Sequence, residues 1–256
     1  MSNLISIITV CFNSASTIEG TILSVANQKY PHKEHVIIDG ASSDGTMSVV
    51  ERYAHILRAV SEPDHGIYDA MNKGIAMASG EILGILNADD FYANETVLDQ
   101  VASVFADATV DACYADLVYV DQKNTNHVTR YWQSKPFQHG LFEKGWMPAH
   151  PTFFVRRKIY EQFGGFDLEF PRQADFELTM RFLEVHNIKA VYVPNIWVNM
   201  RIGGVSNNSV RGVLEGNIEA YRACKKNGLR VSMLPFIVRK MLSRVPQFFK
   251  RPKVTG

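Results

Sequence analysis

The sequence predicts an α/β fold, built as a doubly wound, mostly parallel sheet flanked by helices. Short apolar segments rich in β-branched residues alternate in the first half of the chain with segments of helical pattern. The links between them are short, and such alternation is typical of parallel strands joined by helical crossovers. The chain has 256 residues, of which 46% are hydrophobic and 21% charged. It therefore suits one large folded domain, with or without an extension.

The first half supplies the expected parallel strands. Residues 4–11 form a short apolar run that ends at the turn signal Asn13-Ser14. Ser16 and Glu19 have the spacing of a capping box and open a helix that reaches about Gln28. The elements expected after it are strand 34–39, helix 46–56, strand 57–61, helix 66–78, strand 81–87, helix 95–105 behind the cap residue Asn94, and strand 112–120.

The second half lacks the regular strand–helix alternation of the first. A hairpin turn is expected at residues 124–126, followed by a loop rich in proline, glycine and aromatic residues. The elements expected after that loop are strand 152–155, helices 157–163 and 174–185, strand 189–193 and helix 210–226.

The cysteines and the first residues predict a cytoplasmic protein. Cys11, Cys113 and Cys224 are scattered, with neither metal-site spacing nor a disulfide framework, which favours a reducing compartment. The first ten residues lack the basic start and the cleavage pattern of a signal peptide. No stretch approaches the roughly 18 apolar residues of a membrane span.

Charge is distributed unevenly along the chain. The net charge is +1, but the chain from Arg222 onward holds ten basic residues and no acidic one, so the 221 residues before it carry a net charge of −9. An acidic body argues against a nucleic-acid groove. A basic tail indicates a partner surface of opposite charge.

Polar and acidic side chains follow most of the strands in the first half. Ligands of doubly wound sheets lie beyond the carboxyl ends of the strands, so these residues are candidates for a site. Carboxylates that converge on one edge repel each other unless a cation or hydrogen-bond donors compensate. Asp89 and Asp90 follow a buried strand directly, and their hard oxygen ligands suit Mg²⁺ or Mn²⁺. The residues at these ends are Asn13, Asp39, Asp44, Asp64, Asp89 and Asp90.

The sequence resembles glycosyltransferase family 2, inverting enzymes with a GT-A fold. It is most similar to the non-processive members that build bacterial exopolysaccharide and O-antigen units. Each matching segment is short, but their order and spacing together are specific. The segments are 6–13, 28–31, 36–40, 43–46, 61–74, 87–90, 151–154, 164–167, 174–178 and 203–206.

The resemblance implies roles on the donor side. Phe12 stacks on the nucleobase, and Asp39 accepts a hydrogen bond from the base or ribose. Asp89 and Asp90 match the acidic pair of the metal site, with Asp90 as the expected direct ligand of Mg²⁺ or Mn²⁺. The full set expected at the nucleotide sugar is Val10, Cys11, Phe12, Asn13, Asp39, Asp64, Asn72, Lys73, Asp89 and Arg201.

On the acceptor side, the resemblance makes Asp175 the general base. Glu177 points about 200° away on the same helix, so only one of the two carboxylates faces the substrate. Without the resemblance, Asp175 reads as a helix N-terminal carboxylate. His150 is expected either at a substrate or in a structural role. Arg201, with Gly203-Gly204, forms either a flap over the diphosphate or a surface turn.

The function expected is transfer of one sugar from a nucleotide sugar, with UDP as the nucleotide, to a lipid-linked saccharide in cell-surface polysaccharide synthesis. Asn87 departs from the family's acidic motif, and the Gln-x-x-Arg-Trp motif of processive synthases is absent. A polyprenyl-phosphate sugar synthase and an inactive nucleotide-binding subunit are the alternatives. The expected division is a nucleotide-binding half at 1–121, an acceptor half at 122–228 and an extension at 229–256.

The extension has the pattern of an amphipathic helix. Plotted at about 100° per residue, its apolar residues share one arc, and Arg239, Lys240 and Arg244 lie opposite. Pro246 is expected to kink or end the helix. A helix of this kind lies on an anionic membrane, which predicts peripheral association with the cytoplasmic face. The alternative is a terminal helix packed on the body. The residues of the arc are Leu234, Ile237, Val238, Met241, Leu242, Val245, Phe248 and Phe249.

Overall fold

The structure, a computed structural model, describes residues 3–202, 210–249 and 252. Its strands are β1 (Ile5–Cys11), β2 (Lys33–Asp39), β3 (Arg58–Ser61), β4 (Ile82–Ile85), β5 (Phe91–Tyr92), β6 (Ala112–Val120), β7 (Val128–Trp132), β8 (Phe154–Arg156) and β9 (Ala190–Arg201). Its helices are α1 (Ile18–Ala26), α2 (Thr46–Glu51), α3 (Ile67–Met77), α4 (Val97–Val104), α5 (Arg157–Phe163), α6 (Ala174–Met180), α7 (Val210–Lys226), α8 (Met233–Leu242) and α9 (Pro246–Phe249). Short helical turns are η1 (Phe142–Lys144), η2 (His150–Thr152) and η3 (Arg181–Val185).

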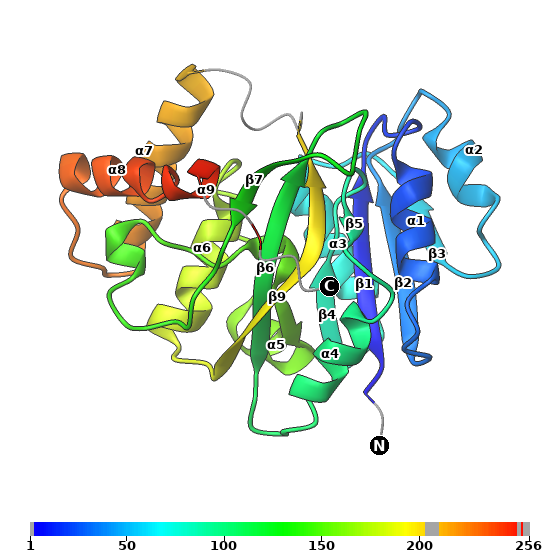
Figure 1. Ribbon diagram of the computed structural model, residues 1–256, viewed down its shortest axis with the longest axis horizontal. Coiled ribbons are helices and arrows are strands. Elements are labelled where there is room, and N and C mark those ends of the chain that lie inside the picture. Colours follow the sequence, from blue (N-terminus) through cyan, green and yellow to red (C-terminus); the bar gives the residue numbers. More distant parts are fainter. Residues whose placement is uncertain (1–2, 203–209, 250–251, 253–256) are drawn as a thin grey trace.

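One sheet runs through the described chain in the order β3-β2-β1-β4-β8-β6-β9-β5, with β7 paired to β6. The pairs β1–β2, β1–β4, β2–β3 and β6–β9 are parallel, whereas β8 lies antiparallel between β4 and β6. Helices cover the sheet (Figure 1). The doubly wound, mostly parallel α/β architecture is therefore confirmed.

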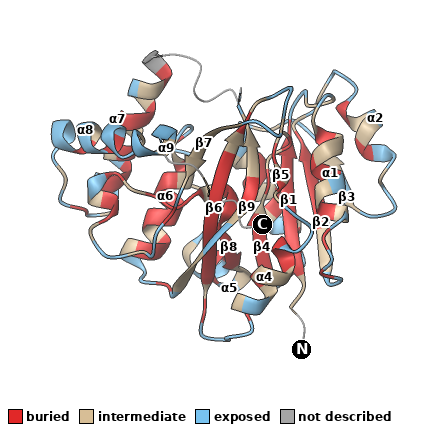
Figure 2. Cartoon of the chain, in the orientation of Figure 1, coloured by how far each residue is buried: buried red, intermediate tan, exposed pale blue. Residues whose placement is uncertain are grey.

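The central strands are buried because apolar residues occupy both of their faces. Ile8 belongs to a core cluster that also contains Ala70 of α3 and Phe176 of α6, whereas the adjacent Ile7 packs with Leu98 of α4. Figure 2 shows the resulting continuous burial along the middle of the sheet. Packing of this kind is typical of strands with helices on both sides.

The predicted capping box of α1 is wrong. Thr17 is the N-cap residue, and it makes no side-chain capping bond. Glu19, which would complete the box, instead accepts a hydrogen bond of 2.7 Å from the Tyr53 hydroxyl and pairs with Arg52 at 3.1 Å. The tertiary contact between α1 and α2 has replaced the local one.

Several boundaries also differ from the prediction. Helix α2 ends at Glu51, and the additional strand β5 follows the Asp89-Asp90 turn. Strand β9 continues to Arg201, far beyond the predicted end at Val193. The Pro194-Asn195 pair looks like a strand end, but irregular register in the pairing with β6 accommodates it. This extension carries Arg201 to the edge of the sheet where β6 ends.

The C-terminal helices pack on the body and also leave an apolar row exposed. Helix α8 contacts α7 and η1, and its Phe236 and Lys240 are buried. The prediction that Lys240 lies with Arg239 on an outward cationic face is therefore wrong for Lys240, which the body covers, whereas Arg239 stays exposed. No described helix is long and apolar enough to cross a bilayer. The large apolar residues that stay exposed on α8, α9 and the turn between them are Met233, Leu234, Val238, Met241, Leu242, Val245, Phe248 and Phe249.

Lys240 is an unusual core residue. Its Nζ lies 3.8 Å from the centroid of the Phe176 ring and makes no hydrogen bond to any described residue. The pKa of Lys240 is lowered to about 7, mainly by burial and in addition by the neighbouring charge of Arg244. Asp175 and Cys224 act in the opposite direction but do not compensate.

We expect Lys240→Met to stabilise the protein by about 1–2 kcal/mol at pH 7, since a buried, unpaired amine is replaced by an apolar chain of similar length. An unfolded lysine has a pKa near 10.4, so between pH 7 and 10 the unfolded state binds a proton that the folded state lacks. This lysine therefore makes wild-type stability rise with pH over that window, and the Met variant should lose that rise. Thermal unfolding at pH 7 and pH 9 measures both, with exposed Arg239→Met as control. A less stable Met variant with the wild-type pH dependence would contradict the assignment.

Candidate active site

The polar residues predicted at the strand ends do meet at one edge of the sheet. Strands β1 to β4 run in parallel, so the residues that follow them lie at the same end. Strand β8 is antiparallel to β4 and therefore begins at that edge, shortly after the turn η2 that contains His150. Strand β9 ends there with Arg201.

Asp39 is fully buried at the end of β2, and neighbouring residues donate hydrogen bonds to both of its carboxylate oxygens. Its Oδ1 accepts hydrogen bonds from the Ser42 hydroxyl at 2.5 Å and the Cys11 thiol at 3.5 Å. Its Oδ2 accepts from the Ser42 backbone N–H at 2.9 Å and the Ser61 hydroxyl at 2.6 Å. Burial alone raises the pKa of Asp39, but these bonds outweigh it and lower the pKa. The carboxylate thus ties β1, β2 and β3 together, and its contact with a nucleotide stays a prediction.

Phe12 and Asp64 lie beside Gly40, in the more open part of this edge. The Phe12 ring is 64% exposed, although Val10 and Cys11 before it are buried. Asp64 accepts the Gly66 N–H at 2.8 Å through Oδ1, and no described residue donates a hydrogen bond to its Oδ2. A Cβ on Gly40 would overlap the Asp64 carboxylate and touch the Phe12 ring. The absence of a side chain at Gly40 therefore lets the ring and the carboxylate approach each other.

Asn13 shapes the loop that follows β1. Its backbone is left-handed, with φ of 50°, a conformation that asparagine tolerates better than most residues. Its Oδ1 accepts the Ser43 N–H at 3.0 Å, and its own N–H donates to the Ser42 hydroxyl at 2.7 Å. The loops after β1 and β2 are consequently held as one unit around the exposed Phe12.

Asn72 and Lys73 on α3 form hydrogen bonds and ion pairs with neighbouring loops. The Asn72 amide bonds both backbone groups of Phe166, at 2.9 and 2.8 Å, and so fixes the loop after α5. Lys73 binds the Pro63 carbonyl and the Glu62 carboxylate, each at 2.8 Å. Both residues therefore organise loops at the edge, and their lining of a nucleotide pocket stays a prediction.

Asp89 and Asp90 form a turn that follows β4. Asp90 is fully buried, and burial followed by the charge of Asp89 raises its pKa well above the ordinary value. Its oxygens accept only long hydrogen bonds, at 3.3 Å from the Arg201 N–H and 3.4 Å from the Asn87 amide. Burial also raises the pKa of Asp89. Two desolvated carboxylates in one turn are poorly compensated by these contacts.

This turn fits a divalent cation. The described residues contain no group of three or more His, Cys, Asp or Glu side chains arranged around a common point. However, Asn87 Oδ1 is buried without a hydrogen-bond partner. Together with the weakly bonded Asp90 it provides hard oxygen atoms of the type that Mg²⁺ and Mn²⁺ take, and these ions complete their coordination with water and phosphate oxygens.

Arg201 contacts the acidic turn through both its guanidinium and its backbone N–H. Its guanidinium donates to the Asp89 carbonyl at 2.5 Å and lies 4.7 Å from the centroid of the Phe91 ring. Its backbone N–H donates to Asp90. The flap expected at Gly203-Gly204 lies outside the described residues, so only the base of that segment is placed.

Asp175 lies in the first turn of α6, in the second half of the site. Its Oδ1 accepts hydrogen bonds from the Tyr68 hydroxyl at 3.1 Å and from the Phe176 N–H at 2.8 Å. Its Oδ2 lies 3.1 Å from His150 Nδ1, an ion-pair distance at an angle that makes no hydrogen bond. The Trp132 ring lies edge-on to His150, with centroids 6.2 Å apart. Tyr68 lies in the segment 61–74, but no role was predicted for it.

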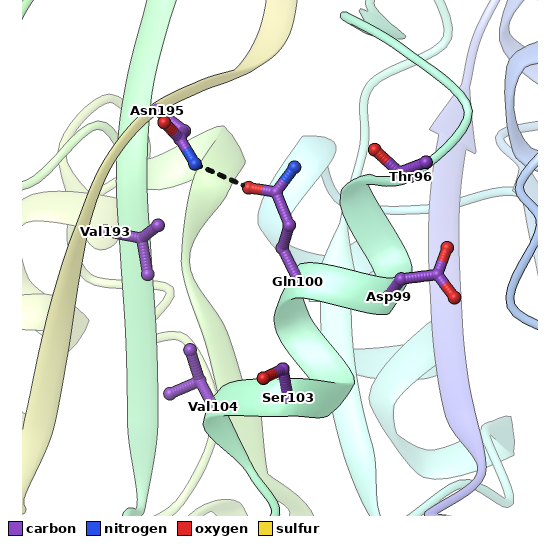
Figure 3. Close-up of a pocket in the computed structure, with 7 residues that line it drawn as sticks. All are labelled: Thr96, Asp99, Gln100, Ser103, Val104, Val193 and Asn195. Carbon is purple, nitrogen blue, oxygen red and sulfur yellow. Dashed lines mark hydrogen bonds between the residues drawn. The ribbon is translucent and has the colours of Figure 1, made fainter.

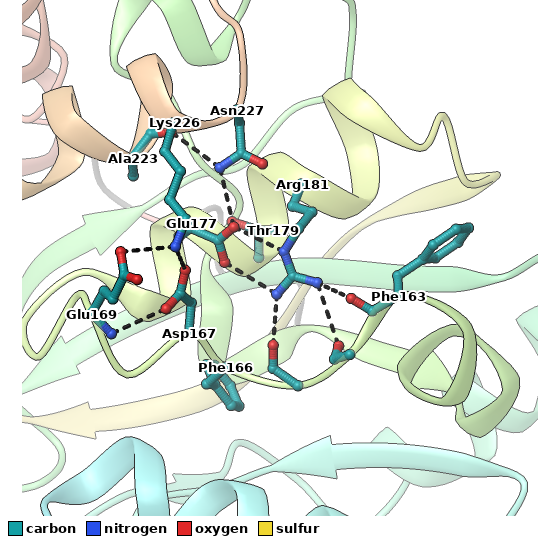
Figure 4. Close-up of polar contacts among 12 residues, drawn as sticks. Phe163, Phe166, Asp167, Glu169, Glu177, Thr179, Arg181, Ala223, Lys226 and Asn227 are labelled. Carbon is teal, nitrogen blue, oxygen red and sulfur yellow. Dashed lines mark hydrogen bonds and ion pairs between the residues drawn. The ribbon is translucent and has the colours of Figure 1, made fainter.

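Glu177, the competing carboxylate, is committed elsewhere. Its carboxylate binds the Arg181 guanidinium at 2.8 and 3.1 Å and accepts the Asn227 amide at 3.1 Å. Arg181 also donates to the carbonyls of Phe163 and Gly165, as Figure 4 shows. The network joins α6, α7 and the loop after α5. The expectation that only one of the two carboxylates faces the site agrees with this arrangement.

The two halves of the site are electrostatically close. Tyr119, near the end of β6, is partly buried, and desolvation is the largest cause of its raised pKa. The charges of Arg130 and Arg244 lower this pKa, and the smaller effects of Asp90 and Asp175 raise it. The pKa of this one side chain thus depends on charges in both the acidic turn and α6.

The hollow drawn in Figure 3 lies elsewhere. Residues of α4 and β9 line it, and Gln100 there accepts hydrogen bonds from Trp197 at 2.8 Å and Asn195 at 2.9 Å. None of the predicted site residues lines it. We therefore place the candidate site at the carboxyl edge of the sheet.

The sequence is similar to those of known proteins over most of its length. Residues 6–164 match the family described as Glycosyl transferase family 2, a segment that includes the acidic turn and His150 and ends before Asp175. An uncharacterized glycosyltransferase of Mycobacterium tuberculosis is 31% identical over 183 residues, which span 69% of this chain and 68% of that protein. A PGL/p-HBAD biosynthesis glycosyltransferase of the same species is 28% identical over 213 residues, covering 81% of this chain and 80% of that one.

Two solved structures share the fold. The mannosyltransferase PcManGT of Pyrobaculum calidifontis, in complex with GDP-Man and Mn²⁺, superposes with a TM-score of 0.67 at 20% identity, over 95% of this chain and 70% of that chain. TarS of S. aureus (residues 1–349), in complex with UDP-GlcNAc, has a TM-score of 0.65 at 16% identity, over 98% of this chain and 74% of that chain.

Proposed function

The chain belongs to glycosyl transferase family 2 and has the GT-A fold, and from this premise we propose that it transfers one sugar, with inversion, from a nucleotide sugar to a lipid-linked saccharide of a cell-surface glycan. The observation that carries the proposal is the pairing of two features at one sheet edge. One is a turn of two desolvated carboxylates, and the other is a separate carboxylate, Asp175, flanked by His150 and Tyr68.

The donor nucleotide is assigned to the edge formed by β1, β2 and β3. The exposed Phe12 ring offers a stacking surface for the base, and Asp64 offers the carboxylate oxygen that its own loop leaves free. With the nucleotide in this position, its diphosphate would lie beside Arg201 and the acidic turn. The solved neighbours carry GDP-Man and UDP-GlcNAc, which supports a nucleotide sugar as donor. UDP is the nucleotide that we propose.

Asp90 and Asn87 are the groups that hold the metal in this proposal, with Asp89 beside them. A bound Mg²⁺ or Mn²⁺ supplies neutralisation of the negative charge that develops on the leaving diphosphate. The Mn²⁺ in PcManGT supports divalent metal use. In this chain, Arg201 orients the turn through the Asp89 carbonyl and thereby fixes the direction of both carboxylates.

Asp175 is the proposed general base. It accepts the proton of the acceptor hydroxyl as the oxygen bonds to the anomeric carbon from the face opposite the diphosphate, and the bond to the diphosphate breaks. Tyr68 donates a hydrogen bond to one oxygen of the carboxylate, and His150 Nδ1 lies 3.1 Å from the other. Glu177 does not compete for this role because Arg181 and Asn227 occupy it.

Donor turnover tests the proposal directly. Purified protein is incubated with a panel of nucleotide sugars and Mn²⁺, with and without polyprenyl-diphosphate saccharides. We expect one UDP sugar to be consumed, and EDTA to stop the reaction. Transfer to polyprenyl phosphate instead would make the protein a polyprenyl-phosphate sugar synthase. Consumption of no nucleotide sugar would overturn the proposal.

We also propose that α8, α9 and the turn between them rest on an anionic membrane. Their exposed apolar row points away from the body, and the same segment carries basic residues without acidic ones. A surface of this composition binds anionic lipid through apolar burial and charge together. Placement there would bring a lipid-linked acceptor to the site.

Replacing Leu234, Leu242 and Phe249 together by Gln should release the protein from liposomes that contain phosphatidylglycerol. These side chains are 74%, 61% and 80% exposed, so we expect no loss of melting temperature and unchanged hydrolysis of the nucleotide sugar. Sedimentation with liposomes measures the release, and Ile56→Gln, an exposed apolar residue of the body, is the control. Wild-type protein that stays in solution with liposomes would contradict the membrane proposal.

A further inference from the structure

Arg130 on β7 has no carboxylate partner among the described residues, although it is held firmly. Its guanidinium lies 4.5 Å from the centroid of the Tyr119 ring and 5.1 Å from that of Phe248 in α9. Its Nε donates to Gln247 Oε1 at 2.7 Å, and its Nη2 donates to the same oxygen. Helix α9 packs on β7 through these contacts (Figure 1). Its charge is therefore positioned but not neutralised.

Arg244 brings a second charge to the same place. It lies one helical turn before Gln247, whose N–H donates to the Arg244 carbonyl at 3.1 Å, so the two side chains share a face. Burial is the main cause of the lowered pKa of Arg130, and the Arg244 charge lowers it further. Among the described residues Arg244 makes no ion pair either. Two arginines held together without a carboxylate favour an anion between them.

This pair lies beside the catalytic edge. Arg130 and Trp132 are two residues apart on β7, so their side chains share one face of the strand. Trp132 contacts the ring of His150, which lies 3.1 Å from Asp175. Tyr119, the register partner of Arg130, has a pKa that responds to Asp90, Asp175, Arg130 and Arg244. An anion at the arginines is consequently adjacent to the position of an acceptor sugar.

The same elements carry the exposed apolar row. Phe248 touches Arg130 and is still half exposed, and Val245 directly follows Arg244. The order from the site outward is therefore carboxylate, cation pair, apolar surface. A molecule with a sugar, a phosphoryl group and a hydrocarbon chain has its parts in that order.

We propose that Arg130 and Arg244 bind the phosphoryl or diphosphoryl group that joins the acceptor saccharide to its lipid. The proposal rests on the proposed function, because it names the part of the lipid-linked acceptor that the protein recognises. Arginine suits this role since its planar guanidinium donates two parallel hydrogen bonds to phosphate oxygens.

Binding of farnesyl diphosphate, measured by calorimetry in EDTA, tests the site without the donor or the metal. We expect Arg244→Gln and Arg130→Gln each to weaken binding at least tenfold, whereas Arg239→Gln, which removes an exposed charge from the same tail, changes it less than twofold. Farnesol, which has the chain without the phosphates, should bind weakly and equally to all four proteins. Equal weakening by Arg239→Gln, or none by Arg244→Gln, would overturn the proposal.

Arg130 also anchors α9, so its variant needs a second control. Gln247→Leu removes the anchoring hydrogen bonds and keeps both charges. We expect it to bind farnesyl diphosphate within about threefold of wild type. A loss as large as that of Arg130→Gln would show that Arg130 acts only by holding the tail, and would overturn its part in the site.

Membrane headgroups are a second source of phosphoryl groups. Vesicles of phosphatidylcholine with phosphatidylglycerol distinguish them, because the proposal expects Arg244→Gln and Arg239→Gln to reduce vesicle binding equally. A selective loss of vesicle binding in Arg244→Gln, with farnesyl diphosphate binding intact, would assign the pair to membrane lipid. The test is separate from that of the proposed function. Farnesyl diphosphate binding that depends on Arg244, in a protein that consumes no nucleotide sugar, would refute the enzymatic proposal alone.

Discussion

Asp175→Asn should leave nucleotide-sugar affinity near wild type and lower the rate of sugar transfer by about 10²–10⁴-fold, the usual contribution of a general base. Asparagine has nearly the same shape and can still accept the hydrogen bond from Tyr68. It cannot take the proton of the acceptor hydroxyl. Because a base acts in the transition state, kcat falls and the binding of donor changes little.

Glu177→Gln is the matched control, since it makes the same chemical change two residues along α6. Glu177 is buried and binds Arg181 and Asn227. Its variant should melt at a lower temperature, because a buried ion pair has lost one partner. Transfer by the protein that remains folded should stay within a few-fold of wild type. Normal transfer by Asp175→Asn, with loss of transfer in Glu177→Gln, would move the base to Glu177.

The parallel part of the fold was predictable because its signals are local. Consecutive residues such as Ile7 and Ile8 pack on opposite faces of the sheet, so a strand buried on both sides appears in the sequence as an unbroken apolar run. Strand β9 was not predictable to its full length. Pro194-Asn195 reads as a strand end, and only the partner strand β6 shows that pairing resumes beyond it.

The gathering of the candidate residues at one sheet edge was predictable, whereas the direction of several of their side chains was not. Parallel topology alone brings Asp64 and Asp90 to one edge. The saturation of Asp39 depends on Ser42 and Ser61, which local pattern does not connect. The contact between Asn72 and Phe166 joins residues 94 positions apart, and no periodicity in the sequence indicates such a partner.

The C-terminal segment shows what a helical pattern leaves undetermined. Periodicity tells which side chains share a face, and the apolar row on α8 follows that expectation. It does not tell which face the body covers. Phe236 and Lys240 pack against the surface formed by Phe176, α7 and η1. A lysine is therefore buried, while several apolar residues stay exposed.

Asp90→Asn should abolish the part of nucleotide-sugar binding that depends on metal. Asp90 is completely buried, and its oxygens accept only long bonds from Arg201 and Asn87. Asparagine fits the same volume but lacks the charge that a divalent cation needs, and Asp90→Ala should give the same loss. We expect calorimetry to show UDP affinity that rises at least 100-fold with Mn²⁺ in the wild type and less than threefold in the variant. Wild-type protein in EDTA should bind UDP as the variant does.

Thermal unfolding gives a readout that needs neither donor nor activity. A ligand at 100 times its Kd stabilises the state that binds it by about 2.7 kcal/mol, so Mn²⁺ at that excess should raise the melting temperature of the wild type by several degrees. Asp90→Asn should show almost no rise. Asp99→Asn, which alters a half-buried carboxylate on α4 away from the acidic turn, should respond to Mn²⁺ as the wild type does. If Asp90→Asn were stabilised as much as these two proteins, the cation would bind elsewhere, and Asp90 would have to serve the turn only through its contacts with Asn87 and Arg201.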